Sequence, residues 1–156
     1  MPFKLLRLAE DQGIIVEYFK FQSRMEAVYM IEPGYPPVIC ISRELPKNRA
    51  HFRSVLAHEL GHHFTLHQGD APSTFLHYSD RVRSSYEEHL AMAWAAKYLM
   101  PKDKLEQALR DEIYTVKDLA RRFVVDEKLV EIRLMIFFEG DMGPEVSKLK
   151  YKINKE

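Results

Sequence analysis

Hydrophobic and polar residues alternate with two different periods along the chain. Residues 3–12 repeat their leucines at helical spacing, and Gly13 follows at the point where many helices end with a left-handed residue. We therefore predict a first helix there. Three short runs rich in β-branched and aromatic residues come next, bounded by turn-prone segments, at 14–20, 25–31 and 37–42. They predict a small antiparallel sheet of about three strands.

The rest of the chain has helical periodicity. Two long helices are predicted at 48–67 and 84–100, the second ended by Pro101, which cannot continue a helix. Shorter helices, each begun by an Asp or Thr suited to capping, are predicted at 103–110, 115–123 and 126–138. We expect an α+β fold in one domain over residues 1–138, made of a helix and sheet (1–47), two long helices (48–100) and C-terminal helices (101–138), followed by a charged tail (139–156).

Size, charge and cysteine content narrow the class of protein. At 156 residues the chain suits one domain with a real core. Its 23 basic and 23 acidic side chains cancel, which argues against direct nucleic-acid binding. No apolar run approaches the roughly 20 residues that cross a bilayer. Cys40 is the single cysteine, and no secretory signal is visible, so we expect a cytoplasmic protein with no membrane association.

One stretch, HFRSVLAHELGHHFTLH at 51–67, holds five of the seven histidines. Within it, 58–62 reads HELGH, the HExxH pattern. Residues four apart lie one turn apart on a helix, so His58 and His62 can reach one ion, and Zn²⁺ suits neutral imidazole. Glu59 between them is placed to act as a general base on water. Such short motifs also occur by chance, and a core helix with surface histidines is the alternative.

A catalytic zinc site needs a third protein ligand and an open position. With one cysteine in the chain, the open site is favoured over a closed structural one. The candidates for the third ligand are Asp70, His77, Asp80, Glu87, Glu88 and His89. Glu87 fits a capping box begun by Ser84, whereas Glu88 lies at the centre of the apolar face of its helix. A carboxylate buried there needs a partner, either zinc or a cation across the interface, which makes Glu88 the preferred ligand.

HELGHHFTLH, followed after a loop by EHLAMAWAAKYLMP from Glu88, resembles the ImmA/IrrE family of zinc metallopeptidases. The segments PPVICISRELPKNRAHFRSVLA and TVKDLARRFVVDEKLVEIRL are similar to family segments too, so the resemblance covers roughly residues 1–137. It implies a zincin-like fold in which the sheet packs on a helical bundle, with His58, His62 and Glu88 as zinc ligands and Glu59 as the catalytic base. One departure is Met92, where the family carries Asn, Asp or Ser.

The resemblance also implies a function. We expect a zinc-dependent endopeptidase that cleaves a specific intracellular protein, often a DNA-binding repressor of a phage or mobile element, as regulatory proteolysis. The donor that stabilises the transition state stays open among His77, Tyr78, Tyr86 and His89. Gly61, inside the motif helix, is expected to let another backbone or a substrate approach closely.

Two other classes of function stay open. Residues 115–134 resemble a helix-turn-helix, which would suit a DNA-binding regulator, but their charges nearly balance and Val124-Val125 lacks the usual turn glycine. A helical pair packed behind the zinc site is the preferred interpretation of this segment. The second alternative is a non-catalytic metal protein that sequesters partners. The sequence leaves the oligomeric state open.

Overall fold

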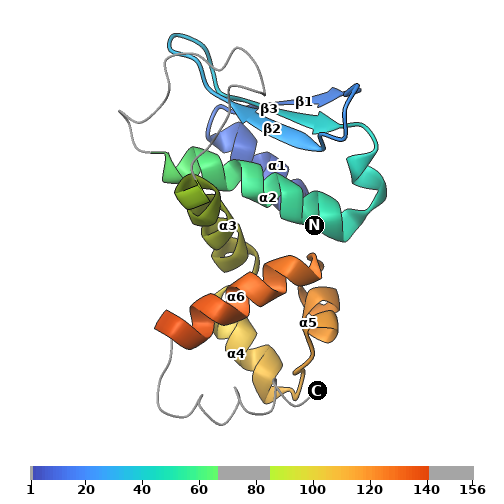
Figure 1. The fold of residues 1–156 in the computed structure, drawn as a ribbon, viewed down its shortest axis with the longest axis vertical. Coiled ribbons are helices and arrows are strands. Elements are labelled where there is room, and N and C mark those ends of the chain that lie inside the picture. Colours follow the sequence, from blue (N-terminus) through green and yellow to red (C-terminus); the bar gives the residue numbers. More distant parts are fainter. Residues whose placement is uncertain (1, 67–84, 141–156) are drawn as a thin grey trace.

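Six α-helices and three strands make up the described part of the chain, residues 2–66 and 85–140 of this computed structural model (Figure 1). In order they are α1 (Pro2–Asp11), β1 (Ile15–Phe19), β2 (Ala27–Met30), β3 (Val38–Ser42), the short 3₁₀ helix η1 (Leu45–Lys47), α2 (Arg49–Thr65), α3 (Ser85–Leu99), α4 (Lys102–Arg110), α5 (Val116–Phe123) and α6 (Glu127–Gly140). Every predicted helix and strand is present, with bounds within a few residues of those expected. Only η1 had no counterpart. The predicted Ser84 cap and most of the charged tail lie outside the described residues.

Gly13 and Asn48 end and begin helices as their residue types predict, whereas the predicted cap at Asp103 was wrong, because α4 begins at Lys102 after Pro101 and has no side-chain cap. Gly13 has a φ of +69°, and the N–H of Ile14 donates to the carbonyl of Ala9 at 2.9 Å, which closes α1 with a left-handed turn. At the N-terminus of α2, the Asn48 side chain accepts a hydrogen bond from the N–H of His51 and so caps the helix. This cap fixes where the motif helix starts.

The prediction of an antiparallel sheet was half wrong, because the three strands form a mixed sheet in the order β1-β3-β2. β2 pairs antiparallel with β3, but β1 pairs parallel with β3, with Ile15 opposite Val38. The physical reason is that the chain reverses direction between β1 and β2 and again between β2 and β3, so β3 runs in the direction of β1 and lies between the two earlier strands. The chain therefore passes from β1 to β2 across the position that β3 later fills.

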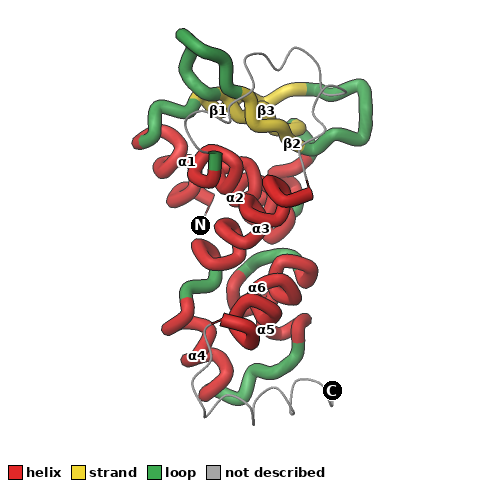
Figure 2. The backbone as a smooth tube through the Cα atoms, turned by 60° about the vertical axis from the view of Figure 1, so that its left-hand side comes forward, coloured by secondary structure: helices red, strands yellow, loops and turns green. Residues whose placement is uncertain are grey.

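Helix α2 lies at the centre of the molecule. The sheet covers one side of α1 and α2, α3 crosses α2 on another side, and α4, α5 and α6 form the far end (Figures 1 and 2). Among helix pairs α2 packs most extensively on α3, and it also contacts β2 and α1. Most of the buried apolar residues form one cluster that runs from Leu5 to Phe137. One core thus holds both the motif helix and its crossing partner.

The turn that joins α5 to α6 is fastened to α2 by polar contacts. Val124 ends α5 in the left-handed conformation, at φ +55°, although it is not a glycine. Arg53 donates from Nε to the Val124 carbonyl at 3.0 Å, and the N–H of Asp126 donates to Ser54 Oγ at 2.9 Å. The N-terminus of α6 is therefore turned toward the motif helix.

Within the described ranges, no helix is both long and apolar enough to cross a membrane.

Candidate metal centre

His58 and His62 lie one turn apart on α2 and point their rings the same way. Their Nε2 atoms are 3.1 Å apart, and the rings meet edge to face. His62 is buried, with 2% of its side chain exposed, whereas His58 is 18% exposed. The Nε2 atoms of buried His62 and partly exposed His58 therefore face the same point, as the i, i+4 spacing predicted.

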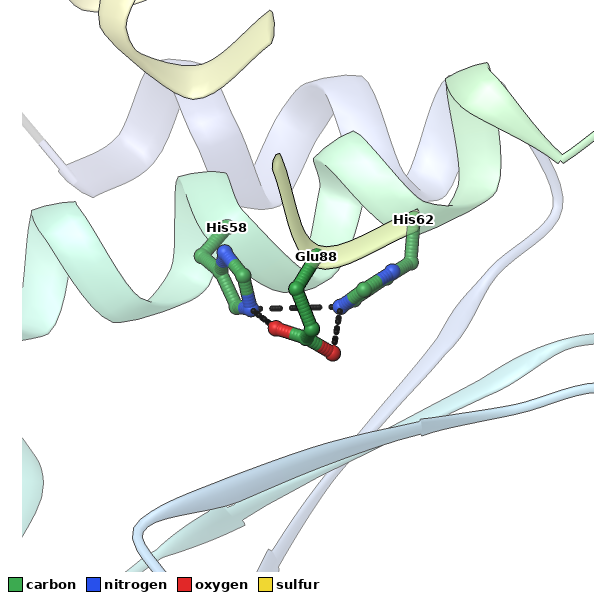
Figure 3. A group of neighbouring side chains, drawn as sticks. All are labelled: His58, His62 and Glu88. Atoms are coloured by element: carbon green, nitrogen blue, oxygen red, sulfur yellow. Dashed lines mark hydrogen bonds and ion pairs between the residues drawn. The ribbon is translucent and has the colours of Figure 1, made fainter. Parts of the chain in front are cut away.

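Glu88 reaches this point from α3, the helix that crosses α2. Its Oε2 lies 2.9 Å from His58 Nε2, and its Oε1 lies 3.1 Å from His62 Nε2 (Figure 3). Hydrogen bonding with His58 and then His62 holds the pKa of Glu88 well below its ordinary value, so this carboxylate is charged at neutral pH. The Glu88 side chain is 45% exposed, less buried than its place on the apolar face suggested. Its exposed side leaves access to the point where the three groups converge.

The three groups fit a small divalent cation. Among the described residues, His58, His62 and Glu88 are the one set of His, Cys, Asp or Glu side chains that could hold a metal ion. Tetrahedral zinc with bonds near 2.0–2.1 Å would set its ligand atoms about 3.3 Å apart. The two Nε2 atoms are 3.1 Å apart, and one ligand atom from each of the three residues can be chosen so that all three lie within 4.8 Å of one another. Small side-chain shifts would bring them to that spacing. Two imidazoles and one carboxylate also match the donor set of open catalytic zinc sites.

Glu59 is the second carboxylate of the motif, and it is buried. Only 7% of it is exposed, and its Oε2 has no hydrogen-bond partner among the described residues. An unpaired buried oxygen is costly, and such groups usually serve a function or bind a water or ion. Because Glu59 is three residues before His62, it lies on a neighbouring azimuth of α2. This placement suits an acceptor for a proton rather than a ligand.

Gly61 explains how α3 comes close enough to deliver Glu88. A Cβ added at Gly61 would lie 2.3 Å from the carbonyl oxygen of Ala91 and 2.9 Å from its carbonyl carbon. These are backbone atoms and cannot rotate away. Gly61 therefore admits another backbone, which is one of the two roles the sequence predicted. Ala91 is three residues after Glu88, so this contact sets the height of Glu88 over the two imidazoles.

We predict that Gly61→Ala destabilises the fold by about 3 kcal/mol, since the added methyl group forces α2 and α3 apart in a packed core. The same shift should withdraw Glu88 and weaken zinc binding about tenfold or more. Denaturant unfolding and zinc titration measure the two effects. Gly140→Ala is the matched control, because a Cβ there meets nothing within 4 Å. Equal stability of the two variants would contradict the close approach.

The other residues considered for this site are placed as follows. Glu87 and His89 lie on α3 on either side of Glu88 in the sequence but are not part of the metal-holding group. Tyr86 is 69% exposed and His89 is exposed too, and no contact within the described segments selects either as the transition-state donor. The remaining candidates, Asp70, His77, Tyr78 and Asp80, lie outside the described residues. That choice stays open.

His63 and Met92 lie near the motif, and their contacts indicate a role in packing. The Nδ1 of His63 lies 2.9 Å from the Tyr29 hydroxyl. Burial lowers the pKa of His63. Met92, one turn after Glu88, lies in the lining of a cavity that also includes His58. The thioether therefore contributes an apolar wall beside the metal centre.

A polar bridge centred on His51 was not predicted from the sequence. Its Nδ1 lies 2.7 Å from Asp126 Oδ2 and its Nε2 lies 2.7 Å from Glu26 Oε1. Burial lowers the pKa of His51, but the hydrogen bonds with the two carboxylates outweigh it, and the net shift is upward. The bridge joins His51 to Glu26, 25 residues before it, and to Asp126, 75 residues after it. The only local signal was the character of Asp126 as a capping residue, which reveals nothing of His51.

Two histidines and a glutamate on crossing helices, beside a small sheet, are features of a metal-dependent peptidase. Comparison with known families agrees, since residues 9–135 match the family model Peptidase_M78, described as the IrrE N-terminal-like domain. The chain belongs to this family of metallopeptidases, as the resemblance to ImmA/IrrE proteins predicted. No curated protein and no solved structure matches the chain.

Proposed function

We propose that the protein is a zinc-dependent endopeptidase in which His58, His62 and Glu88 hold the metal and Glu59 is the catalytic base. The observation that carries this proposal is the convergence of His58, His62 and Glu88 from two crossing helices. Each Nε2 lies 2.9–3.1 Å from one Glu88 carboxylate oxygen, and the two Nε2 atoms are 3.1 Å apart. Zinc, when bound, supplies a Lewis acid that activates water and polarises the scissile carbonyl. Family membership supports peptide hydrolysis as the reaction.

The side chains of the protein bind the metal and transfer the proton. His58 and His62 donate neutral nitrogen lone pairs, and the Glu88 carboxylate offsets part of the cation's charge. Glu59 Oε2, buried and without a hydrogen-bond partner in the described segments, accepts a proton from the attacking water and later returns it to the leaving amine. The amide bond is cleaved by this transfer, and the two products separate as a carboxylic acid and an amine.

The edge of the sheet offers a place for the substrate backbone. β2 is an edge strand, it contacts α2, and the residues just before it share a cavity lining with His58. An extended peptide that adds to this edge would run past the metal centre. We propose that the substrate is an intracellular DNA-binding repressor, of the kind that controls a phage or mobile element, and that cleavage occurs in the cytoplasm and relieves repression.

Removing the metal tests the reaction. We expect a zinc-loaded sample to cleave a repressor encoded beside the protein's own gene, and a sample stripped with a chelator and dialysed to lose at least about 99% of the rate. Adding one equivalent of zinc should restore cleavage. Mass spectrometry of the fragments identifies a single cleaved bond. Cleavage that persists after the metal is removed would contradict the proposal.

The alternative of a DNA-binding regulator is weakened by the placement of α6. In a helix-turn-helix the start of the second helix faces the major groove. Here Asp126, just before α6, contacts His51 and Ser54 of α2, and Leu129, Val130 and Leu134 of α6 are buried. These contacts favour a helical pair packed behind the metal centre.

A further inference from the structure

A cavity of about 360 Å³ opens beside the metal centre. His58 is part of the cavity lining. A substrate side chain that enters the cavity would therefore belong to a residue next to the peptide bond held at the metal. The wall is drawn from the segment before β2, from α2, from α3 and from the start of α6. Its apolar members are Met25, Ala27, Val55, Met92 and Leu129.

The two carboxylates in the lining, Glu26 and Asp126, would at first suggest a pocket for a basic side chain. Both are already engaged, because each lies 2.7 Å from a different nitrogen of His51. A histidine that donates from both nitrogens is a cation, and the raised pKa of His51 agrees with that state. The bridge thus neutralises part of the acidic charge and fixes both carboxylates in place.

The other polar members of the lining also disfavour a basic occupant. Ser54 Oγ donates to the Ala50 carbonyl and accepts from the N–H of Asp126, so its hydrogen bonds are satisfied within the fold. The remaining charged side chains, Arg24 and Lys128, are cations on the exposed rim. A substrate lysine or arginine would meet like charges at the entrance, and both carboxylates of the described lining are already bonded to His51. A carboxylate side chain would have to leave water for the apolar wall.

We propose that this cavity is a specificity pocket that binds an uncharged apolar side chain, such as leucine, methionine or phenylalanine, next to the scissile bond. This inference rests on the proposed peptidase function and adds the class of residue that the enzyme selects. Met92, one turn after Glu88, and Val55, one turn before His58, form the part of the pocket closest in sequence to the metal ligands. They are specificity-determining residues.

Binding of small zinc chelators tests the pocket without catalysis. The probes are amino-acid hydroxamates that share one zinc-binding group and differ in a single side chain: alanine, leucine, phenylalanine, aspartate and lysine. We expect the zinc-loaded protein to bind the leucine and phenylalanine probes about 30-fold more tightly than the aspartate and lysine probes, measured by calorimetry. The alanine probe should fall between them.

A variant whose cavity is filled by a larger side chain provides the second test. Ala27→Phe places a ring in the cavity, and we expect it to bring the leucine and phenylalanine probes to the affinity of the alanine probe while zinc content stays at one equivalent. Equal wild-type affinity for all five probes would overturn the pocket but leave the zinc site intact. Failure of every probe to bind a zinc-loaded sample would overturn the open metal site, and the pocket with it.

Discussion

Glu59→Gln is expected to lower the rate of substrate cleavage by about 10³-fold while the protein still binds one zinc ion. General-base catalysis by a positioned side chain contributes typically 10²–10⁴-fold. Glutamine has nearly the same shape as glutamate, but its amide cannot accept the proton from the attacking water. Because Glu59 is buried and Oε2 has no hydrogen-bond partner in the described part of the chain, the substitution removes a basic oxygen without breaking a hydrogen bond to it.

The measurement is a single-turnover assay with zinc-loaded samples whose metal content is known. Glu10→Gln, on the exposed side of α1, makes the same chemical change far along the chain from the motif and should cleave at the wild-type rate. Metal analysis separates loss of the base from loss of zinc. If Glu59→Gln and wild type cleave at equal rates, Glu59 is not the base and another group must accept the proton.

The local geometry of the metal centre followed from the sequence, because it depends on helix periodicity alone. Four residues of separation place His58 and His62 on one side of α2 whatever surrounds the helix. The choice of Glu88 over its neighbour depended on one more step, the position of an acid on an apolar helix face, and the structure places that side chain beside both imidazoles. Caps such as Asn48 were equally accessible, since a cap is a contact within one turn.

Features that depend on contacts between distant segments could not be predicted in the same way. The parallel pairing of β1 with β3 requires β2 to lie on the far side of β3, and no turn signal records that order. The bridge from Glu26 through His51 to Asp126 joins three segments whose meeting is decided only by the packed fold. Gly61 is an intermediate case. A glycine inside the motif helix predicted a close approach by a backbone or a substrate, and the structure identifies the backbone of Ala91.

Glu88→Ala is expected to weaken zinc binding by at least about 100-fold, whereas Glu87→Ala should bind zinc as wild type does. Loss of outer hydrogen-bond partners alone costs 10–100-fold in metal affinity, and Glu88 is the proposed ligand itself. It is also the one anion in the described metal-holding group, so its removal leaves a doubly charged cation with two neutral imidazoles. Competition with a chromogenic chelator measures both affinities.

The same pair of variants can be compared by thermal unfolding. A ligand that binds only the folded state at 100 times its Kd adds about 2.7 kcal/mol to stability, so zinc should raise the Tm of wild type and Glu87→Ala by several degrees and leave Glu88→Ala nearly unchanged. Without zinc, Glu88→Ala loses the contacts of the carboxylate with His58 and His62, which contribute modestly because the Glu88 side chain is 45% exposed. The metal-dependent shift therefore separates coordination from ion pairing. A zinc-dependent rise in Glu88→Ala equal to that of wild type would assign the third ligand to another residue.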